Sequence, residues 1–297
     1  MAGNAQSVCW SRSAAAKRSV ELRQNSKPTR RLRDAVHVNR YSLLTLLLTL
    51  SACNMQLRAL PGAIAEAPGT AVPRSGWTVI APGLEWREIA QDKDQLSQLK
   101  LLRIDPERYF FRARYSPAKP YSLAQWRARE PEAAAIVNAN FFDPSYRALG
   151  LVISDGEGQG SPYLERGGSF IVNNGRPAVR ANASMSQRNL ESAEQAVQGF
   201  PLLVQNGEQA YFGGAKQERA RRTAIAEDAA GNILIISAPL LGPTLGDLSA
   251  FLAESDLEIE TAFNLDGGAS TLMAVASIDY FQPSFDAVPV ILAVYKR

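Results

Sequence analysis

Three turn dipeptides in the middle of the chain most constrain its fold. Asp155-Gly156, Asn174-Gly175 and Asn206-Gly207 each follow a short apolar run. These pairs tolerate the positive backbone φ of a tight hairpin turn, so antiparallel strands are expected on both sides of them. The clearest case is Asn174-Gly175, between SFIVN and RPAVR. The sequence therefore predicts hairpins rather than the strand–helix rhythm of a parallel sheet.

Two helices are expected among these strands. Ser122 and Gln125 have the spacing of a capping box and begin a helix at 122–130, which Pro131 stops. Thr244 and Asp247 cap the second helix, whose shared apolar face is Leu245, Leu248, Phe251 and Leu252. Further strands are predicted at 109–115, 134–142, 150–154, 200–205, 222–228, 232–238, 261–265, 271–275 and 288–295. The fold class is therefore α+β, a mixed, largely antiparallel β-sheet with a few packed helices in a single domain.

The first 52 residues have the pattern of an export signal. Basic residues precede the apolar run 43–50, which is too short to span a bilayer as a helix. The run ends in LSAC, residues 50–53, which resembles the lipobox of bacterial lipoproteins. We expect 1–52 to be a basic leader and lipoprotein-type signal peptide, with a lipid anchor on Cys53. Asn54 favours the outer membrane, and the alternative is a plain cleaved signal before an unmodified cysteine.

Cleavage at this point would limit the available chemistry. His37, the only histidine, and Cys9 both precede the cut. The mature chain would then lack Ser-His-Asp and Cys-His catalysis, zinc bound by His or Cys, and a structural disulfide. Catalysis would fall to Asp, Glu, Arg, Lys, Tyr, Ser or Asn, or to a hard cation held by oxygen atoms. A divalent cation is conceivable, but the sequence indicates no dedicated metal site and no cofactor.

Charge and composition separate the leader from the rest of the chain. Residues 1–40 hold nine of the 32 basic and two of the 29 acidic residues, which leaves a net charge of −4 on the remainder. A nucleic-acid partner is therefore not expected. Residues 53–76 are rich in Ala, Pro and Gly without a period, as is typical of a tether. No internal repeat follows, so 77–297 is expected to be one domain.

Two segments place polar side chains where a predicted strand begins or ends. IVNANFFD, residues 136–143, carries Asn138 and Asp143, with Phe141 or Phe142 as an apolar wall for a sugar. RRTAIAED, residues 221–228, places Arg222 at the head of an apolar strand, where a guanidinium can clamp an anion. The alternative for 136–143 is a set of ordinary turn residues after a strand. The alternative for Arg222 is an ordinary surface salt bridge.

NLDGGAS, residues 264–270, is the most informative segment. Gly267 and Gly268 let the backbone approach a ligand closely and leave Asp266 without bulky neighbours. Asn264 lies on the same strand face as Asp266, and Ser270 can reach the same place. A plain Asp-Gly turn is the alternative.

Taken in order, five segments resemble the phosphodiester glycosidase family: NANFFD (138–143), LGLVISDG (149–156), QGFPLLVQNG (198–207), RRTAIAED (221–228) and NLDGGAS (264–270). This family includes the lysosomal uncovering enzyme, which removes N-acetylglucosamine from its phosphodiester, and bacterial proteins associated with exopolysaccharide. The likeness covers roughly residues 95–297. The sequence departs from the family's glycines at Ala139-Asn140, Ala226-Glu227 and Ala269.

The resemblance implies site residues motif by motif. Asp266, Arg222 and Asn138 are expected to be catalytic: Asp266 stabilises oxocarbenium-like charge or activates water, Arg222 holds phosphate, and Asn138 orients the diester. The expected substrate-binding residues are Asn264, Gly267, Gly268, Ser270, Thr223, Phe142 and Asp143. A second carboxylate stays open among Asp143, Asp155, Glu157 and Glu227, and the stereochemical outcome stays open with it.

We therefore expect a hydrolase that cleaves the glycosyl–phosphate bond of sugar-1-phosphodiesters in envelope or extracellular glycopolymers. A phosphate monoester is a good leaving group, so an imidazole acid is dispensable. Its expected partners are a phosphorylated glycan or sugar-1-phosphodiester and, through the lipid anchor, a membrane. The expected location is the bacterial cell envelope, as an exported outer-membrane lipoprotein. One alternative is a non-catalytic binder of anionic glycans on the same fold, and another is a hydrolase acting on a different substrate such as peptidoglycan.

Overall fold

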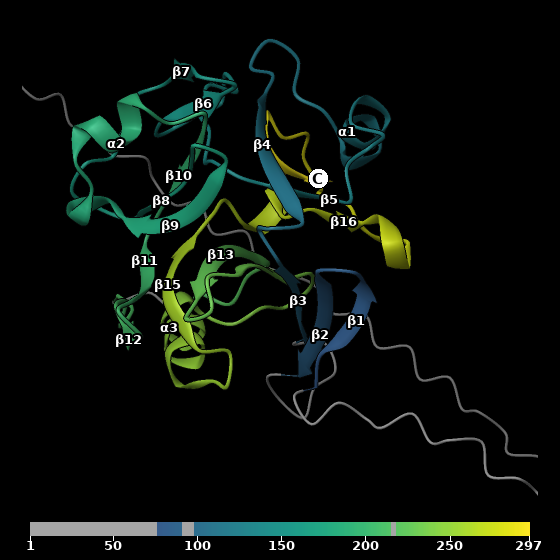
Figure 1. Ribbon diagram of the computed structural model, residues 1–297, viewed down its shortest axis with the longest axis vertical. Coiled ribbons are helices and arrows are strands. Elements are labelled where there is room, and N and C mark those ends of the chain that lie inside the picture. The colour runs from purple at the N-terminus through teal and green to yellow at the C-terminus, as the bar shows by residue number, and fades with distance from the viewer. Residues whose placement is uncertain (1–75, 91–97, 215–217) are drawn as a thin grey trace, which may run out of the picture. The chain divides into compact units, whose positions relative to one another are not determined.

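The computed structural model describes residues 76–90, 98–214 and 218–297 (Figure 1). The predicted signal peptide, Cys53 and nearly all of the predicted tether lie outside these residues. Within the described part of the chain, no helix is long and apolar enough to cross a membrane.

The described strands form three sheets, and the strand pairs in them are antiparallel. The eight-stranded sheet has the order β1 (Thr78–Ala81), β2 (Leu84–Ala90), β3 (Gln98–Ile104), β14 (Ile233–Ala238), β13 (Arg222–Asp228), β15 (Ile259–Asn264), β11 (Leu202–Gln205) and β12 (Glu208–Gln209). The β8–β10 sheet has the order β7 (Glu157–Gln159), β6 (Val152–Ser154), β10 (Gln195–Gly199), β8 (Gly168–Asn173) and β9 (Arg176–Ala181). The β5–β18 sheet has the order β17 (Tyr280–Gln282), β16 (Met273–Val275), β5 (Ala135–Asn138), β18 (Val290–Lys296) and β4 (Tyr109–Tyr115).

Each sheet turns one face to a common core and covers the other with a helix. The common core takes Ile225 and Phe263 from the eight-stranded sheet, Phe170 from the β8–β10 sheet, and Val137 and Leu292 from the β5–β18 sheet. The outer faces pack against α3 (Leu245–Glu254), α2 (Gln187–Glu191) and α1 (Leu123–Arg129) in the same order. Short 3₁₀ turns are formed by Asn182–Ser184, Gly268–Ser270 and Ala276–Ile278. The fold is therefore α+β, and the strands that carry the candidate site share one core.

The hairpin turns form where the sequence predicts them. Asn174 and Gly175 have φ values of 50° and 68°, and Asn206 and Gly207 have 53° and 78°. Both pairs therefore adopt the left-handed backbone that Asn-Gly favours. The capping box on Ser122 and the side-chain cap on Thr244 are also present.

The predicted strand at 134–142 is much longer than the observed one. The run 134–142 forms a strand only over Ala135–Asn138. At Ala139 the chain begins to leave the β5–β18 sheet: its amide still donates to the Val290 carbonyl at 3.1 Å, but its carbonyl accepts from the Asp266 amide at 2.9 Å. This early exit brings the segment after β5 alongside the Asp266 turn.

Candidate active site

The turn after β15 is held by its backbone. The Leu265 amide donates to the Thr223 carbonyl at 2.9 Å, and the Gly268 amide donates to the Arg221 carbonyl at 2.8 Å. Together with the bond from Asp266 to Ala139, these fix the turn between the head of β13 and the segment after β5. Asp266 is therefore placed by the end of β15 and by bonds to the head of β13 and the segment after β5, rather than by a free loop.

The two glycines of this turn have different structural roles. A Cβ on Gly267 would lie 2.9 Å from the Arg221 carbonyl oxygen, so the close approach of the two backbones requires glycine there. Gly268 has a φ of +60° with open space around its Cβ position, so it supplies the left-handed conformation instead. The close backbone contact at Gly267 is with the Arg221 carbonyl, so the predicted approach to a ligand stays a prediction.

The Asp266 carboxylate is mostly buried and keeps two hydrogen bonds. Its Oδ1 accepts from the Gly267 amide at 2.8 Å, and the Ser270 side chain also bonds to the carboxylate. Desolvation by burial raises the pKa of Asp266 to about 6, against the lowering effect of these two hydrogen bonds. The negative charge of Asp286 raises this pKa further. Asp266 therefore changes protonation near neutral pH, as a general acid or base must.

Asp286 is a carboxylate that the sequence analysis did not single out. It is exposed, and the amides of Phe285 and Asp286 both donate to the Ala269 carbonyl, at 2.7 and 3.3 Å. These bonds place the 285–286 segment directly on the Asp266 turn. No motif marks Asp286 in the sequence, because contact between two loops brings it to the site.

Arg221 is a second residue that the sequence analysis did not single out, since it favoured the neighbouring Arg222. Its guanidinium is buried, and Nη2 donates to the carbonyls of Thr271 and Pro283 at 2.7 and 2.8 Å. The same group lies 4.4 Å from the centre of the Phe285 ring. Arg221 therefore holds the loop that carries Asp286 against the segment after Ser270.

Asn138 and Thr223 are brought together behind the turn. The Asn138 Nδ2 donates to the Asp266 carbonyl at 2.6 Å, and its Oδ1 accepts from the Thr223 hydroxyl at 2.9 Å and the Leu272 amide at 3.0 Å. Asn138 is 1% exposed and Thr223 is fully buried. Their geometry supports a role in positioning Asp266 rather than direct contact with a substrate.

The side chain of Arg222 is directed to other loops. Its Nε donates to the Pro243 carbonyl at 3.2 Å and its Nη2 donates to the Glu218 carbonyl. Only its backbone lies beside the site, 3.7 Å from the Cβ position of Gly267. The expectation that this guanidinium holds phosphate next to Asp266 therefore gains no support from its contacts, and Arg222 instead braces the loops beside the head of β13.

The remaining predicted binding residues divide into two groups. Asn264 is buried near the turn and donates from Nδ2 to the Phe200 carbonyl at 3.0 Å. Asp143 instead closes its own turn, accepting from the amides of Ser145 and Arg147 at 2.8 and 3.0 Å. Phe142 stacks on Tyr146 with 5.7 Å between ring centres, whereas Phe141 stacks on Phe200 beside Asn264. Phe141 is therefore the aromatic residue on the Asp266 side.

Other carboxylates considered for the second position are engaged elsewhere. Asp155 pairs with Arg114 at 3.0 Å. Glu227 pairs with Arg180 at 2.6 Å and accepts from the Val179 amide at 2.7 Å, so it joins β13 to β9. Glu157 lies exposed on β7. Asp286 fits the second position better, since it alone among these carboxylates affects the pKa of Asp266.

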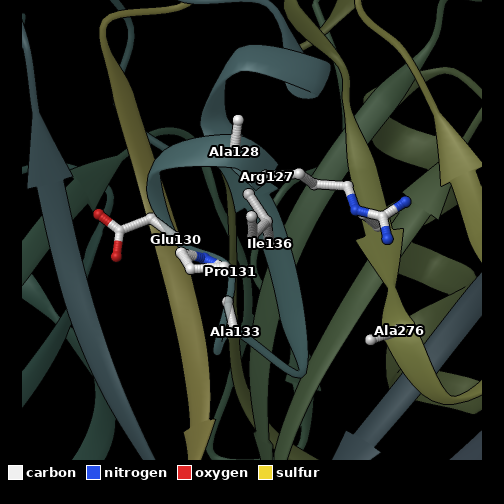
Figure 2. A pocket seen from close by; sticks show the side chains of 8 residues that line it. Arg127, Ala128, Glu130, Pro131, Ala133, Ile136 and Ala276 are labelled. Carbon is white, nitrogen blue, oxygen red and sulfur yellow. The ribbon is translucent and has the colours of Figure 1, made fainter.

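A pocket of about 330 Å³ beside the C-terminal end of α1 lies apart from these residues (Figure 2). Arg127 and Glu130 are its charged lining residues, and their side chains point to opposite sides. The Glu130 carboxylate already accepts hydrogen bonds from Arg114 Nε and the Tyr295 hydroxyl. This pocket shares no residue with the predicted site. Among the described residues, no cluster of three or more His, Cys, Asp or Glu side chains is placed to hold a metal ion.

Comparison with known proteins identifies the family. Residues 131–295 match the sequence model described as phosphodiester glycosidase, which is more than half of the chain. The chain belongs to the phosphodiester glycosidase family. Membership indicates a hydrolase of the glycosidase type, and the matched range contains Asn138, Arg222, Asp266 and Asp286.

Two solved structures have the same fold as this chain. One is a hypothetical protein from Synechocystis, with a TM-score of 0.55 and 18% identity, covering 72% of this chain and 62% of its own. The other is the zebrafish N-acetylglucosamine-1-phosphodiester alpha-N-acetylglucosaminidase catalytic domain, auto-inhibited by its pro-peptide, with a TM-score of 0.55 and 17% identity. That likeness covers 73% of this chain and 85% of the zebrafish domain. A comparison with curated proteins found no significant match.

Two residues at positions where the sequence resemblance implies glycine make bonds between strands. Asn140 accepts from the Gln198 amide at 3.3 Å and donates to the Leu151 carbonyl at 3.2 Å. Glu227 makes the bonds to β9 described above. Ala269 offers its carbonyl to Phe285 and Asp286, a contact that needs only backbone. These substitutions leave the Gly267-Gly268 turn intact.

Proposed function

We propose that the protein hydrolyses the glycosyl–phosphate bond of sugar-1-phosphodiesters. Family membership supports the reaction class, and one observation carries the assignment to a site. Asp266 is a mostly buried carboxylate with a pKa of about 6, on a turn that is bonded to the head of β13 and to the segment after β5. A preorganised carboxylate of this kind suits chemistry at an anomeric carbon.

In the proposed reaction, water adds to the anomeric carbon and the bond from that carbon to the phosphate oxygen breaks. The bonding electrons leave with the phosphate monoester, which is stable as an anion and needs no proton from the enzyme. Ionised Asp266 takes the proton from the attacking water or stabilises the positive charge on the sugar. The products are the free sugar and a phosphate monoester. Burial is the main cause of the raised Asp266 pKa and the charge of Asp286 adds to it, so we assign Asp286 as the second carboxylate.

The neighbouring residues hold this arrangement. Asn138 and Thr223 fix the backbone of Asp266 from behind, and Arg221 fixes the loop that carries Asp286. We assign them positioning roles, because positioning within a fraction of an ångström governs such reactions. Ser270 keeps the carboxylate in one orientation.

The test is the fate of UDP-N-acetylglucosamine with the full chain in water enriched in oxygen-18. The zebrafish relative is named for N-acetylglucosamine-1-phosphodiesters, which makes this sugar the first to try. We expect UDP and free N-acetylglucosamine, with the heavy oxygen on the sugar. Asp266→Asn should lower the rate by about 10²–10⁴-fold. Asp279→Asn is the matched control, since its carboxyl side chain is 93% exposed.

Two results would reject this assignment. Heavy oxygen on the phosphate would mean cleavage of the phosphorus–oxygen bond, and an unchanged rate in Asp266→Asn would place the chemistry elsewhere. Saturable binding of the sugar phosphate with no product would support the alternative, a non-catalytic binder of anionic glycans.

We further propose that the protein acts at the cell envelope on phosphorylated glycopolymers, anchored by lipid on Cys53. The support is the apolar run followed by LSAC in the sequence. Metabolic labelling with a fatty acid should mark the wild-type protein in the membrane fraction and leave Cys53→Ser unlabelled. Label on Cys53→Ser would reject this anchor.

A further inference from the structure

Three chain segments lie in direct backbone contact beside the Asp266 turn. A Cβ on Gly167 would lie 2.0 Å from the Gly199 carbonyl oxygen, and a Cβ on Gly199 would lie 2.3 Å from the Asn264 carbonyl oxygen. The entry to β8, the end of β10 and the end of β15 are therefore stacked with no side chain between them. Arg166 immediately precedes the first of these residues, and Asp266 is two positions beyond the last.

Arg166 is an exposed arginine that lies against two aromatic rings, Tyr163 and Phe200, which also contact each other edge to face. Its guanidinium carbon lies 4.8 Å from the centre of the Tyr163 ring and 4.9 Å from that of Phe200. Phe200 in turn stacks on Phe141, with ring centres 4.7 Å apart. We call these four residues the Arg166 platform. It presents a cation and an aromatic surface side by side.

A buried polar network fixes the loop that carries the platform. The Gln198 side chain accepts from the Tyr163 amide at 2.9 Å and donates to the Tyr163 carbonyl at 3.2 Å. It also donates to the Ser169 hydroxyl, which donates to Asn182 Oδ1 at 2.6 Å. Asn182 Nδ2 then donates to the Arg166 carbonyl at 2.8 Å. The side chains of Gln198, Ser169 and Asn182 are 2% exposed or less. This buried network therefore fixes the backbone of the loop at both Tyr163 and Arg166.

The Arg166 guanidinium differs from the backbone of its loop in its polar contacts. Within the described residues, no hydrogen bond or ion pair is made by its nitrogen atoms. Arg103 shows the contrast: it stacks on Trp77 at 4.1 Å but also pairs with Glu85 at 3.1 Å. A guanidinium that is stacked on rings keeps its N–H edges free for a planar, two-pronged contact with an anion.

We propose that the Arg166 platform is the phosphate-binding subsite of this protein, in which Arg166 holds the phosphoryl oxygens and Phe141 lies along the sugar or the group beyond the phosphate. This inference rests on the proposed function, since it names the part of the site that recognises the leaving group. It also moves the phosphate contact from Arg222, whose Nε and Nη2 donate to carbonyl groups, to a side chain that is free to make it.

The experiment measures binding to the full chain carrying Asp266→Asn, so that a substrate is not consumed. The probes are UDP-N-acetylglucosamine, inorganic phosphate and neutral N-acetylglucosamine, titrated by calorimetry. Adding Arg166→Gln should weaken the binding of the two phosphate-containing probes by about 10- to 100-fold, because a charged hydrogen-bonding pair is lost. Arg166→Lys keeps the positive charge but not the two-pronged geometry of the guanidinium, so it should give a smaller loss of affinity. Binding of the neutral sugar should not change.

Arg129→Gln is the matched control, because Arg129 is also exposed and stacks on a ring, Tyr121, at 4.6 Å. It should leave every dissociation constant within about twofold of the parent. The proposal is overturned if Arg166→Gln behaves like this control, if it weakens neutral sugar as much as the phosphates, or if neither phosphate probe binds the parent. If the wild-type protein cleaves no phosphodiester but Arg166→Gln still weakens the binding of the phosphate probes, the hydrolase assignment fails and the phosphate subsite stands.

Discussion

Asp266 carries its negative charge at a cost to folding. In an unfolded chain its pKa is about 3.9, and in the folded protein burial raises it to about 6. Below about pH 4 Asp266 is protonated in both states and does not lower the free energy of unfolding. Between about pH 4 and pH 6 the unfolded chain loses this proton first, so the protein becomes less stable as pH rises, and above about pH 6 the loss of stability is constant. A difference of about two pKa units corresponds to at most about 3 kcal/mol.

We therefore expect Asp266→Asn to be more stable than wild type at pH 7.5 and nearly equal to it at pH 4. Thermal unfolding across this range measures the difference, with Asp279→Asn as the exposed control. A stability gain that does not vary with pH would contradict the burial of this charge.

Asp286 should tune Asp266 through its charge. If ionised Asp266 is the active form, kcat/KM falls as pH drops below about 6. Removal of the neighbouring charge in Asp286→Asn should lower the Asp266 pKa and shift the midpoint of this fall to lower pH. A lower rate with an unmoved midpoint would mean that Asp286 affects only the shape of the loop.

At the scale of secondary-structure elements, Asn138 joins β5 to β13 and to the residue that precedes β16. Its Oδ1 satisfies the Thr223 hydroxyl and the Leu272 amide, both of which are buried. Asn138→Ala should cost about 1–3 kcal/mol for each group left unsatisfied, and it should lower kcat because the Asp266 carbonyl loses its donor. Thr223→Val removes one of these bonds and should cost less. Chemical denaturation and steady-state kinetics check both, and an Asn138→Ala protein that matches Thr223→Val would reject the shared role.

The same elements explain what the sequence could predict. The hairpins at Asn174-Gly175 and Asn206-Gly207 depend on two adjacent residues, so local chemistry is enough to identify them. The Asp266 turn was also predictable, because its two glycines mark both the close contact and the left-handed residue. Strand pairing across three sheets was not, since the partners are far apart in sequence.

Long-range contacts also decide the site residues that sequence reasoning assigned differently. Arg221 and Arg222 are adjacent, yet one reaches Thr271 and Pro283 and the other reaches Pro243 and Glu218. The sequence motif favoured Arg222 because it directly precedes Thr223. Nothing in the local sequence distinguishes the directions that the two guanidinium groups take. Arg166 and Asp286 lie outside every motif for the same reason.

At the scale of the whole domain, the common core links the site to all three sheets. Phe263, the residue before Asn264, is fully buried between the eight-stranded sheet and the β8–β10 sheet. It rests on Gly168 at the start of β8, where a Cβ would lie 2.5 Å from Phe263 Cδ1 and 2.9 Å from its Cβ. Packing between two sheets therefore fixes the strand that delivers Asp266.

Gly168→Ala should consequently reduce stability and activity together. The added methyl group forces the Phe263 ring to move, at a cost of about 1–3 kcal/mol, and moves the end of β15 with it. Gly214→Ala is the control, because nothing lies within 4 Å of that Cβ position. Urea unfolding should show a lower midpoint with an unchanged slope for Gly168→Ala. Phe263→Ala removes Cγ and Cδ1, the two atoms that would lie closest to the added methyl group, so the double variant should lose less than the two single losses added together. Simple additivity would mean that Gly168 and Phe263 do not share this contact and that the site does not depend on it.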